Sequence, residues 1–282
     1  MKNKVIFSGC SYTAGNGWED LPAEQSLKKE CKDSPYLWVN ICHKESDLLN
    51  NLELVNLGQC NASNTEIFEN TIRSISSHFD EVAYVICQWT AMPRYNFKVG
   101  FETWSTYESL QNIGGRPNHN VNLNKGISWP REYINDLLDR LLVLHHLHWE
   151  ILKVVKYSSV ITSLCAKARA KVFFVNGICP WDLDYFTVLD NTIYQPEDLT
   201  NFTKKEILNI ETRDDKEIWN LYYQAHKDYQ SEGGVDSKKW INLYSSFSKQ
   251  IIDHNHDNRH PGIISNQKYA KQVKNFLTTQ AN

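Results

Sequence analysis

Short runs of β-branched and aromatic residues alternate with helical patterns along this chain, and this alternation constrains its fold more than any other feature. The four runs are Lys4–Phe7, Leu52–Leu57, Val82–Cys87 and Lys171–Val175. Near-continuous apolar runs of this length are typical of parallel strands covered on both faces. Helical periods are found at about 36–45, at 64–77, where Asn64 is expected to cap the helix, and at 266–277. The order β-α-β-α-β predicts an α/β fold with a central parallel sheet.

A longer helical pattern runs over residues 131–170. As a single rod it would be about 60 Å long, which exceeds the diameter of a compact domain of this size. We therefore expect the segment either to break, near 157–159 or into two antiparallel halves, or to project beyond the sheet, and we favour the break or the two halves. Two stretches, about 91–130 and 180–237, are interpreted as long loop and helical insertions. We expect one domain spanning residues 1–282 that carries both insertions.

Charge and composition argue against several classes of function. The chain has 30 Lys and Arg residues against 33 Asp and Glu, a formal net charge of -3, and no polybasic segment, so we expect no nucleic-acid partner. No apolar run approaches the roughly 18 residues of a membrane span, and the N-terminus lacks the pattern of a signal peptide, so we expect no membrane partner and a cytoplasmic location. A viral or phage-encoded chain would look the same. Seven cysteines without a C-x-x-C pair predict reduced, mostly buried thiols.

A serine follows the first expected strand. Ser11 lies in the segment FSGCSYTAG, residues 7–15, beyond the carboxyl end of a strand, where open α/β sheets build their sites. A helix that begins there would add unpaired N–H groups and a positive dipole end, and both stabilise an oxyanion. The same turn is equally compatible with phosphate binding in a flavodoxin-like protein, so the loop alone does not separate the two functions.

Asp257 and His260 precede the last expected helix. An Asp three residues before a His can fold back so that its carboxylate meets Nδ1–H, which leaves Nε2 to accept a proton from a hydroxyl. These are the two roles that a serine nucleophile needs from other side chains. Pro261 is expected in the first turn of the closing helix.

Together the two segments resemble the SGNH (GDSL-like) hydrolases. That family has a G-x-S-x-T-x-G pattern after the first strand and D-x-x-H-P before the last helix; here they read GCSYTAG at 9–15 and DNRHP at 257–261. The resemblance implies the SGNH hydrolase fold, a flavodoxin-like three-layer α/β/α sandwich. It also implies an esterase with Ser11 as nucleophile, His260 as base and Asp257 orienting it, without metal or cofactor.

The resemblance further implies the donors of an oxyanion hole. The backbone N–H of Ser11 is the first donor. A second backbone donor follows the second strand, at Gly58 or, by its spacing along the loop, at Asn61. The side-chain asparagine that the family carries after the third strand is absent here, so Gln88 or Thr90 is expected to donate in its place.

Other polar residues near these motifs have structural interpretations. Cys10 replaces the aspartate that usually precedes the nucleophile, and we expect it to be a buried thiol while Ser11 faces solvent. His254 and His256 stand close to Asp257, but their spacing matches no metal motif, so we expect exposed loop residues and no metal site.

The expected substrate is a small-molecule or glycan ester. Aromatic residues in the two insertions suit stacking on sugar rings, which favours an O-acetyl group on a carbohydrate. An alternative is a glycan- or protein-binding module of the same fold that no longer turns over an ester. A flavodoxin-like phosphate or nucleotide binder is a third hypothesis, and it leaves Asp257 and His260 without a role.

Overall fold

The computed structural model describes residues 2–16, 31–60, 62–90, 94–99, 103–108, 147–177, 237–241, 247–256 and 260–281. The chain divides into two compact units. The first comprises Met1–Ala91, Tyr157–Pro180 and Val235–Asn282, and the second comprises Met92–Lys156 and Trp181–Gly234. The second unit overlaps both predicted insertions, and the single-domain boundary stays a prediction.

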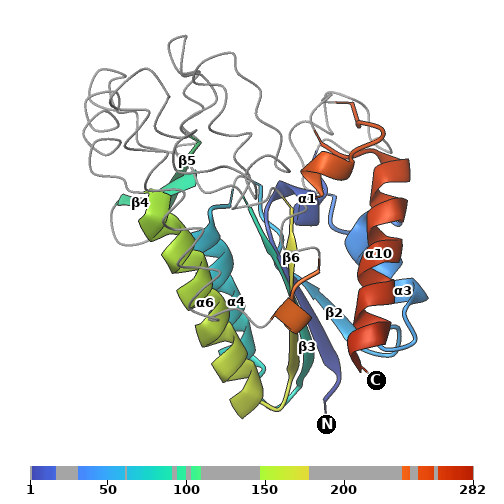
Figure 1. Ribbon diagram of the computed structural model, residues 1–282, viewed down its shortest axis with the longest axis horizontal. Helices are drawn as coiled ribbons and strands as arrows, with labels where there is room; N and C mark the ends of the chain where they lie inside the picture. The colour runs from blue at the N-terminus through green and yellow to red at the C-terminus, as the bar shows by residue number, and fades with distance from the viewer. Residues whose placement is uncertain are drawn as a thin grey trace, which may run out of the picture. The chain divides into compact units, whose positions relative to one another are not determined.

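A four-stranded parallel sheet forms the centre of the first unit (Figure 1). Its strands are β1 (Lys4–Ser8), β2 (Glu53–Asn56), β3 (Val82–Trp89) and β6 (Lys171–Asn176). Their order is β2-β1-β3-β6, and every neighbouring pair is parallel. The chain passes from β1 to β2 on one side and then to β3 on the other, so the order reverses between β1 and β3. Ligand sites of doubly wound sheets lie beyond the carboxyl ends of the strands at such a point.

Helices cover both faces of this sheet (Figure 1). They are α3 (Trp38–Glu45), α4 (Asn64–Ser77), α6 (Leu147–Lys167) and α10 (Ile263–Ala281). Helices α3 and α10 pack together on one face, where Lys274 Nζ lies 3.1 Å from Glu45 Oε2. On the other face Phe68 of α4 stacks on Tyr157 of α6, with ring centroids 4.1 Å apart. The predicted α/β fold with three layers is confirmed.

The two central strands carry the core. Val5, Ile6 and Phe7 of β1 are fully buried, as is Ile86 of β3. The ring of Phe7 meets Trp38 of α3 edge-on, with centroids 5.5 Å apart. Burial on both faces explains why these strands have near-continuous apolar sequences.

The start of α4 differs by one residue from the prediction. Ser63, not Asn64, caps the helix, and its side chain accepts a hydrogen bond from Glu66 N while the Glu66 carboxylate accepts one from Ser63 N. This reciprocal pair is a capping box. Asn64 is thereby released to bond the backbone of Thr90, at the end of β3.

The predicted break near 157–159 is wrong, because α6 is continuous over its 21 residues. The segment contains neither Gly nor Pro, the residues that most often interrupt a helix. A helix of this length spans about 32 Å, which a compact unit accommodates. The predicted length of about 60 Å assumed a helix that begins at residue 131, and residues 131–146 lie outside the described part of the chain.

The first predicted loop insertion contains regular structure. Strands β4 (Arg94–Val99) and β5 (Thr103–Glu108) form an antiparallel hairpin in which Arg94 is opposite Glu108. The sequence RYNFKV alternates in the two-residue period of strands, whereas TWSTYE does not. The Gly, Asn and Pro content of the wider stretch obscured this signal. Most of 180–237 lies outside the described residues.

A short segment extends the sheet beyond β6. Trp240 forms a parallel bridge with Phe174. Further along, Phe247 N donates to Asn176 O at 2.8 Å, and Ser248 N donates to Gly177 O at 2.9 Å. The chain therefore runs beside β6 before it turns toward α10, an arrangement that the sequence did not predict.

Candidate active site

Ser11 lies at the turn that follows β1. Gly9 and Cys10 leave the strand, and Ser11 opens the short helix α1 (Ser11–Ala14), which ends at Gly15 in the left-handed conformation, φ 73°. A Cβ on Gly9 would lie 2.1 Å from Thr13 Oγ1, so only glycine fits under this turn. Ser11 is 2% exposed, so the expectation that it faces solvent is wrong: the compact turn holds the side chain inward.

His260 meets this serine from the other end of the chain. Its Nε2 lies 2.8 Å from Ser11 Oγ, although 249 positions separate the two residues. The Tyr12 ring packs edge-on against the imidazole, with centroids 5.5 Å apart. The distance is within hydrogen-bond reach, so the imidazole can accept the serine proton.

Hydrogen bonds hold the two segments together on either side of this contact. Asn255 bridges them, because its N–H donates to His260 O at 3.0 Å and its Nδ2 donates to Asn16 O at 2.9 Å. Asn255 is 3% exposed, so these bonds are shielded from water. Asn255 thus helps to hold the serine and histidine segments in place relative to each other.

Trp38 adds a second link. Its indole Nε1 donates to Tyr12 O at 3.0 Å, and its backbone N donates to Asn266 Oδ1 at 3.0 Å. Asn266 in turn donates to Pro261 O at 3.0 Å. Pro261 itself precedes α10 by two residues, so its expected place in the first helical turn is wrong; it pairs instead with His254 in a short antiparallel bridge.

Asp257, the expected third member of a triad, lies outside the described residues. A second carboxylate nearby, Asp253, has a different role, because it caps the start of α10. Its Oδ2 accepts from Ile264 N at 2.9 Å and its Oδ1 accepts from Ser265 N at 2.7 Å. Burial alone would raise the pKa of Asp253, but the hydrogen bonds from Ser265 and Ile264 outweigh it and hold the pKa below its usual range.

The predicted backbone donors after β2 fall into two cases. Gly58 N–H donates to the side-chain Oδ1 of Asn56 at 2.9 Å, so it is engaged within its own loop. As placed, Gly58 does not offer an available oxyanion donor, which corrects that candidate. An asparagine two residues before a glycine favours this turn, and the sequence contained that signal. Asn61 lies outside the described residues.

The carboxyl end of β3 holds the two predicted side-chain donors. Gln88 is fully buried; its Oε1 accepts from Thr13 Oγ1 at 2.7 Å, while its Nε2 has no hydrogen-bond partner in the described part of the chain. Thr90 is also fully buried, and its Oγ1 has no partner either. Asn64 binds both backbone groups of Thr90 at 2.9 Å, which fixes the strand end. Buried donors without partners are uncommon in folded proteins.

Cys10 precedes Ser11 and is a buried thiol. It is fully buried, as predicted, and precedes the first residue of α1. Its sulfur is 4.0 Å from Gln88 Oε1.

Two residues that hold the site in place, Thr13 and Asn255, were not predicted from the sequence. Thr13 stood inside the first motif and was detectable there, whereas nothing in the sequence marked Asn255.

His254 and His256 are exposed, as predicted. Across the described ranges, no group of three His, Cys, Asp or Glu side chains is arranged to hold a metal ion. Of the helices that the structure describes, none has an apolar stretch of the length needed to cross a membrane.

The whole chain is similar to solved structures of ester hydrolases. A lipase/acylhydrolase from Enterococcus faecalis is 10% identical, covers 99% of this chain and 96% of its own, and has a TM-score of 0.43. A member of the lipolytic protein G-D-S-L family from Veillonella parvula DSM 2008 is 13% identical, with 98% coverage of both chains and a TM-score of 0.39. An acetyl xylan esterase from the rumen bacterium Butyrivibrio proteoclasticus is 14% identical, covers 99% of this chain and 64% of its own, and has a TM-score of 0.42. No protein-family model and no curated protein sequence matches the chain.

Proposed function

We propose that this chain is a serine hydrolase that cleaves an acyl ester through Ser11 and His260. The observation that carries the proposal is the 2.8 Å distance between Ser11 Oγ and His260 Nε2. The pair lies at the carboxyl edge of a parallel sheet, beside the point where the strand order reverses, which is where sheets of this kind place their sites. A hydroxyl that hydrogen-bonds an imidazole nitrogen is the arrangement that activates a serine nucleophile.

The reaction follows from this geometry. His260 Nε2 accepts the hydroxyl proton of Ser11 as Oγ attacks the acyl carbon, which forms a tetrahedral oxyanion. Collapse of that intermediate breaks the bond to the alcohol oxygen, and His260 returns the proton to the departing alcohol. Water then attacks the acyl-enzyme with His260 as base, which releases the carboxylic acid and restores Ser11.

Asp257 is proposed to accept a hydrogen bond from the other ring nitrogen of His260 and so to fix its tautomer. The proposal rests on the three-residue spacing between the two residues. Asp253 is a poor substitute for this role, because the start of α10 engages both of its carboxylate oxygens. Replacing Asp257 by Asn is therefore expected to reduce turnover, whereas Asp253→Asn leaves it unchanged.

The oxyanion is proposed to be stabilised by the backbone N–H of Ser11 and by Gln88 Nε2 or Thr90 Oγ1. Gln88 Nε2 and Thr90 Oγ1 are both buried without a partner, so a substrate oxygen would supply the hydrogen bond that each lacks. Thr13 supports the role of Gln88, because its hydroxyl donates to Oε1 and leaves Nε2 as the group of the amide that can donate to a substrate. One such donor contributes about 2.7–4 kcal/mol to the transition state.

The proposed substrate is an O-acetyl ester of a carbohydrate. This part of the proposal rests on the aromatic residues of the two insertions, whose side chains lie outside the described residues. A test compares turnover of acetylated xylan with that of p-nitrophenyl acetate and p-nitrophenyl octanoate. Faster hydrolysis of the octanoate than of both acetates would contradict an acetyl substrate while leaving the serine mechanism intact.

A second candidate is a binding module of the same fold without turnover. The engaged N–H of Gly58 favours it, because one of the expected oxyanion donors is thereby lost. Ester turnover by the purified chain separates the two candidates. Hydrolysis of p-nitrophenyl acetate that is lost in Ser11→Ala and kept in Cys10→Ala supports the enzyme. No turnover of any acyl chain, with the fold intact by circular dichroism, supports the binder.

A further inference from the structure

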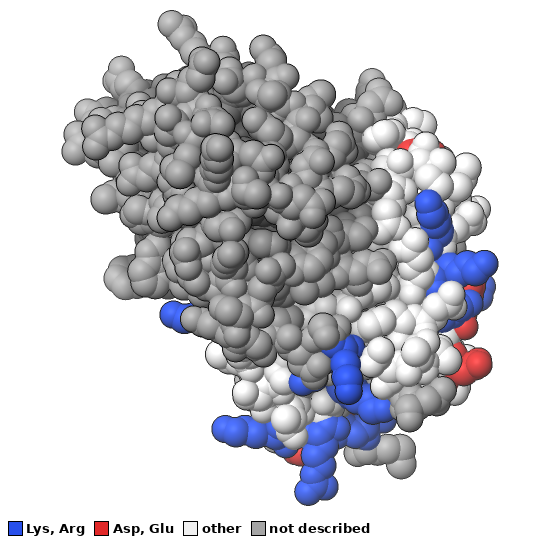
Figure 2. All heavy atoms as spheres, viewed as in Figure 1, with Lys and Arg blue, Asp and Glu red and all other residues white. Residues whose placement is uncertain are grey.

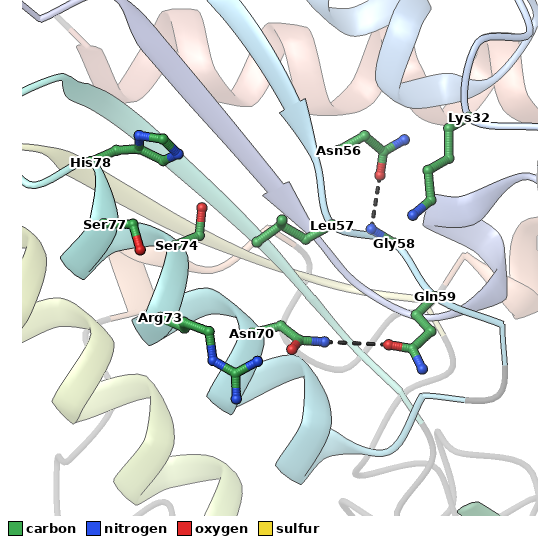
Figure 3. A pocket seen from close by; sticks show the side chains of 10 residues that line it. All are labelled: Lys32, Asn56, Leu57, Gly58, Gln59, Asn70, Arg73, Ser74, Ser77 and His78. Atoms are coloured by element: carbon green, nitrogen blue, oxygen red, sulfur yellow. Dashed lines mark hydrogen bonds between the residues drawn. The ribbon is translucent and has the colours of Figure 1, made fainter. Parts of the chain in front are cut away.

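A groove runs between the loop that follows β2 and helix α4, within the first unit (Figure 3). Its volume is about 490 Å³. The residues that line it are Lys32, Asn56, Leu57, Gly58, Gln59, Asn70, Arg73, Ser74, Ser77 and His78. The volume is in the range of small-molecule sites. Neither Ser11 nor His260 lines the groove, so the proposed ester hydrolysis does not account for it.

The charges of the groove all have one sign. Lys32 and Arg73 line it, and among the described residues of its lining there is no Asp or Glu. The chain as a whole is acidic, with 33 Asp and Glu against 30 Lys and Arg. Elsewhere on the surface, Figure 2 shows Lys and Arg side chains with Asp and Glu close to several of them. A concave surface lined by one sign of charge concentrates ligands of the opposite sign.

Arg73 is the group best suited to bind an anion. Its side chain is exposed and, among the described residues, has no ion pair or hydrogen bond. Its planar guanidinium can donate two parallel hydrogen bonds to a phosphate or carboxylate. His78 follows at the C-terminal end of α4 and also lines the groove.

Neutral hydrogen-bonding groups lie between these charges. Asn70, Ser74 and Ser77 project from one side of α4, and Gln59 faces them from the loop (Figure 3). Asn70 Nδ2 reaches Gln59 Oε1 at 3.4 Å, a weak bond that a ligand hydroxyl can replace. Such groups suit the hydroxyls of a polyol, which donate and accept at once.

We propose that this groove binds a small phosphorylated polyol, such as a sugar phosphate, with the phosphate on Arg73 and the hydroxyl groups on the amide and serine side chains. A phosphate monoester carries close to two negative charges at neutral pH, which matches the two cations of the groove, Lys32 and Arg73. The site is separate from the proposed ester chemistry and does not depend on it.

Two residues that line the groove also hold the turn that carries Ser11. Asn56 Nδ2 donates to Thr13 O at 3.0 Å, and Gln59 N donates to Gly9 O at 3.1 Å. A Cβ on Gly58 would lie 2.5 Å from backbone atoms of α1, so this loop and α1 are in direct contact. A ligand in the groove therefore touches the same loop that supports Ser11, and its binding is expected to alter the thermal stability of the first unit.

The test is calorimetric titration of the full chain in 100 mM salt with three probes: inorganic phosphate, ribose 5-phosphate and ribose. Saturable binding of phosphate, tighter binding of ribose 5-phosphate and no binding of ribose are expected. Arg73→Gln should weaken ribose 5-phosphate binding at least tenfold. Lys271→Gln, which removes an exposed cation on α10 outside the groove, should leave it unchanged.

Two results would overturn the proposal. The first is no saturable binding of either phosphate probe at 10 mM. The second is an equal loss in Arg73→Gln and Lys271→Gln, which would indicate general charge attraction. Asn70→Ala gives an independent check, because it should weaken ribose 5-phosphate binding more than phosphate binding. Ester turnover is not the readout, so failure of the esterase proposal leaves this test intact.

Discussion

The two ends of β3 differ in what they bury. Toward its start the strand buries Val82, Val85 and Ile86, which are apolar and need no hydrogen bonds. At its carboxyl end lie two buried polar atoms, Gln88 Nε2 and Thr90 Oγ1, and neither has a hydrogen-bond partner among the described residues. Each such atom costs about 1–3 kcal/mol of stability. The body of the sheet therefore adds to the stability of the fold, whereas the unpaired polar atoms at its carboxyl edge lower it.

The largest effect is expected at that edge. His260→Gln removes the proposed base but keeps a side chain of similar size, so kcat/KM for p-nitrophenyl acetate should fall by about 10³-fold or more. The midpoint of thermal unfolding should change little, because His260 is only half-buried. Full activity in this variant would show that the Ser11–His260 contact is not used in catalysis.

Gln88→Met is expected to have the next largest effect. It keeps the volume but removes both Nε2 and the Oε1 that accepts from Thr13 Oγ1, so kcat should fall by about 10²- to 10³-fold. The free energy of unfolding should change little, because removal of the unpaired Nε2 offsets the loss of the bond to Thr13. Thr13→Val is the matched control, because it removes only the bond to Gln88 Oε1. Its loss of kcat should be smaller. Equal losses would mean that Gln88 acts only by holding α1 in place.

The body of the sheet should respond in the opposite way. Ile86→Val removes one methylene from a fully buried side chain and should lower the free energy of unfolding by about 0.5–1.5 kcal/mol. Turnover per folded molecule should not change. Denaturant unfolding followed by circular dichroism, with kcat measured on the same samples, checks both. A loss of kcat in Ile86→Val without a loss of stability would contradict the proposed difference between the two ends of β3.

The smallest effect is expected at Asp253, which lies near His260 in sequence but supports α10. Its pKa is lowered by hydrogen bonds, so its contribution to stability is present above the unfolded pKa of about 3.9 and is lost as pH falls through the folded value. Asp253→Asn should cost about 0.5–1 kcal/mol at pH 7, and this cost should shrink as pH falls below about 3.9. A difference that grows toward low pH would contradict this account of the cap.

Much of the fold could be predicted because each strand carries its own signal. A strand buried on both faces needs an apolar run, and the runs ending at Phe7 and Cys87 correspond to β1 and β3. The rule that such sheets build their sites at the carboxyl edge marked Ser11. The meeting of Ser11 with His260 was implied by the resemblance of the two end motifs to the SGNH hydrolases. Gln88 was harder to place in the strand, because it is polar. The expected apolar run ended before it, at Cys87, although β3 continues to Trp89.

The supports of the site were not predictable in the same way. The Asn255 amide bonds Asn16, 239 positions away in sequence, and Trp38 bonds a carbonyl in α1 and the side chain of Asn266 in α10. Such bonds depend on where loops lie in three dimensions, and a single asparagine or tryptophan carries no periodic signal. The hairpin β4–β5 was missed for a different reason, because loop-forming residues around it outweighed the alternation in β4.

Covalent labelling tests the central claim most directly. A fluorophosphonate reacts with a serine only when a base activates the hydroxyl, and it does not depend on the identity of the natural ester. Mass spectrometry of the treated chain should find one phosphonyl group on the peptide that contains Ser11, none in Ser11→Ala and much slower labelling in His260→Gln. An unlabelled wild-type chain, or a label on a different serine, would contradict the assignment of Ser11 as the nucleophile.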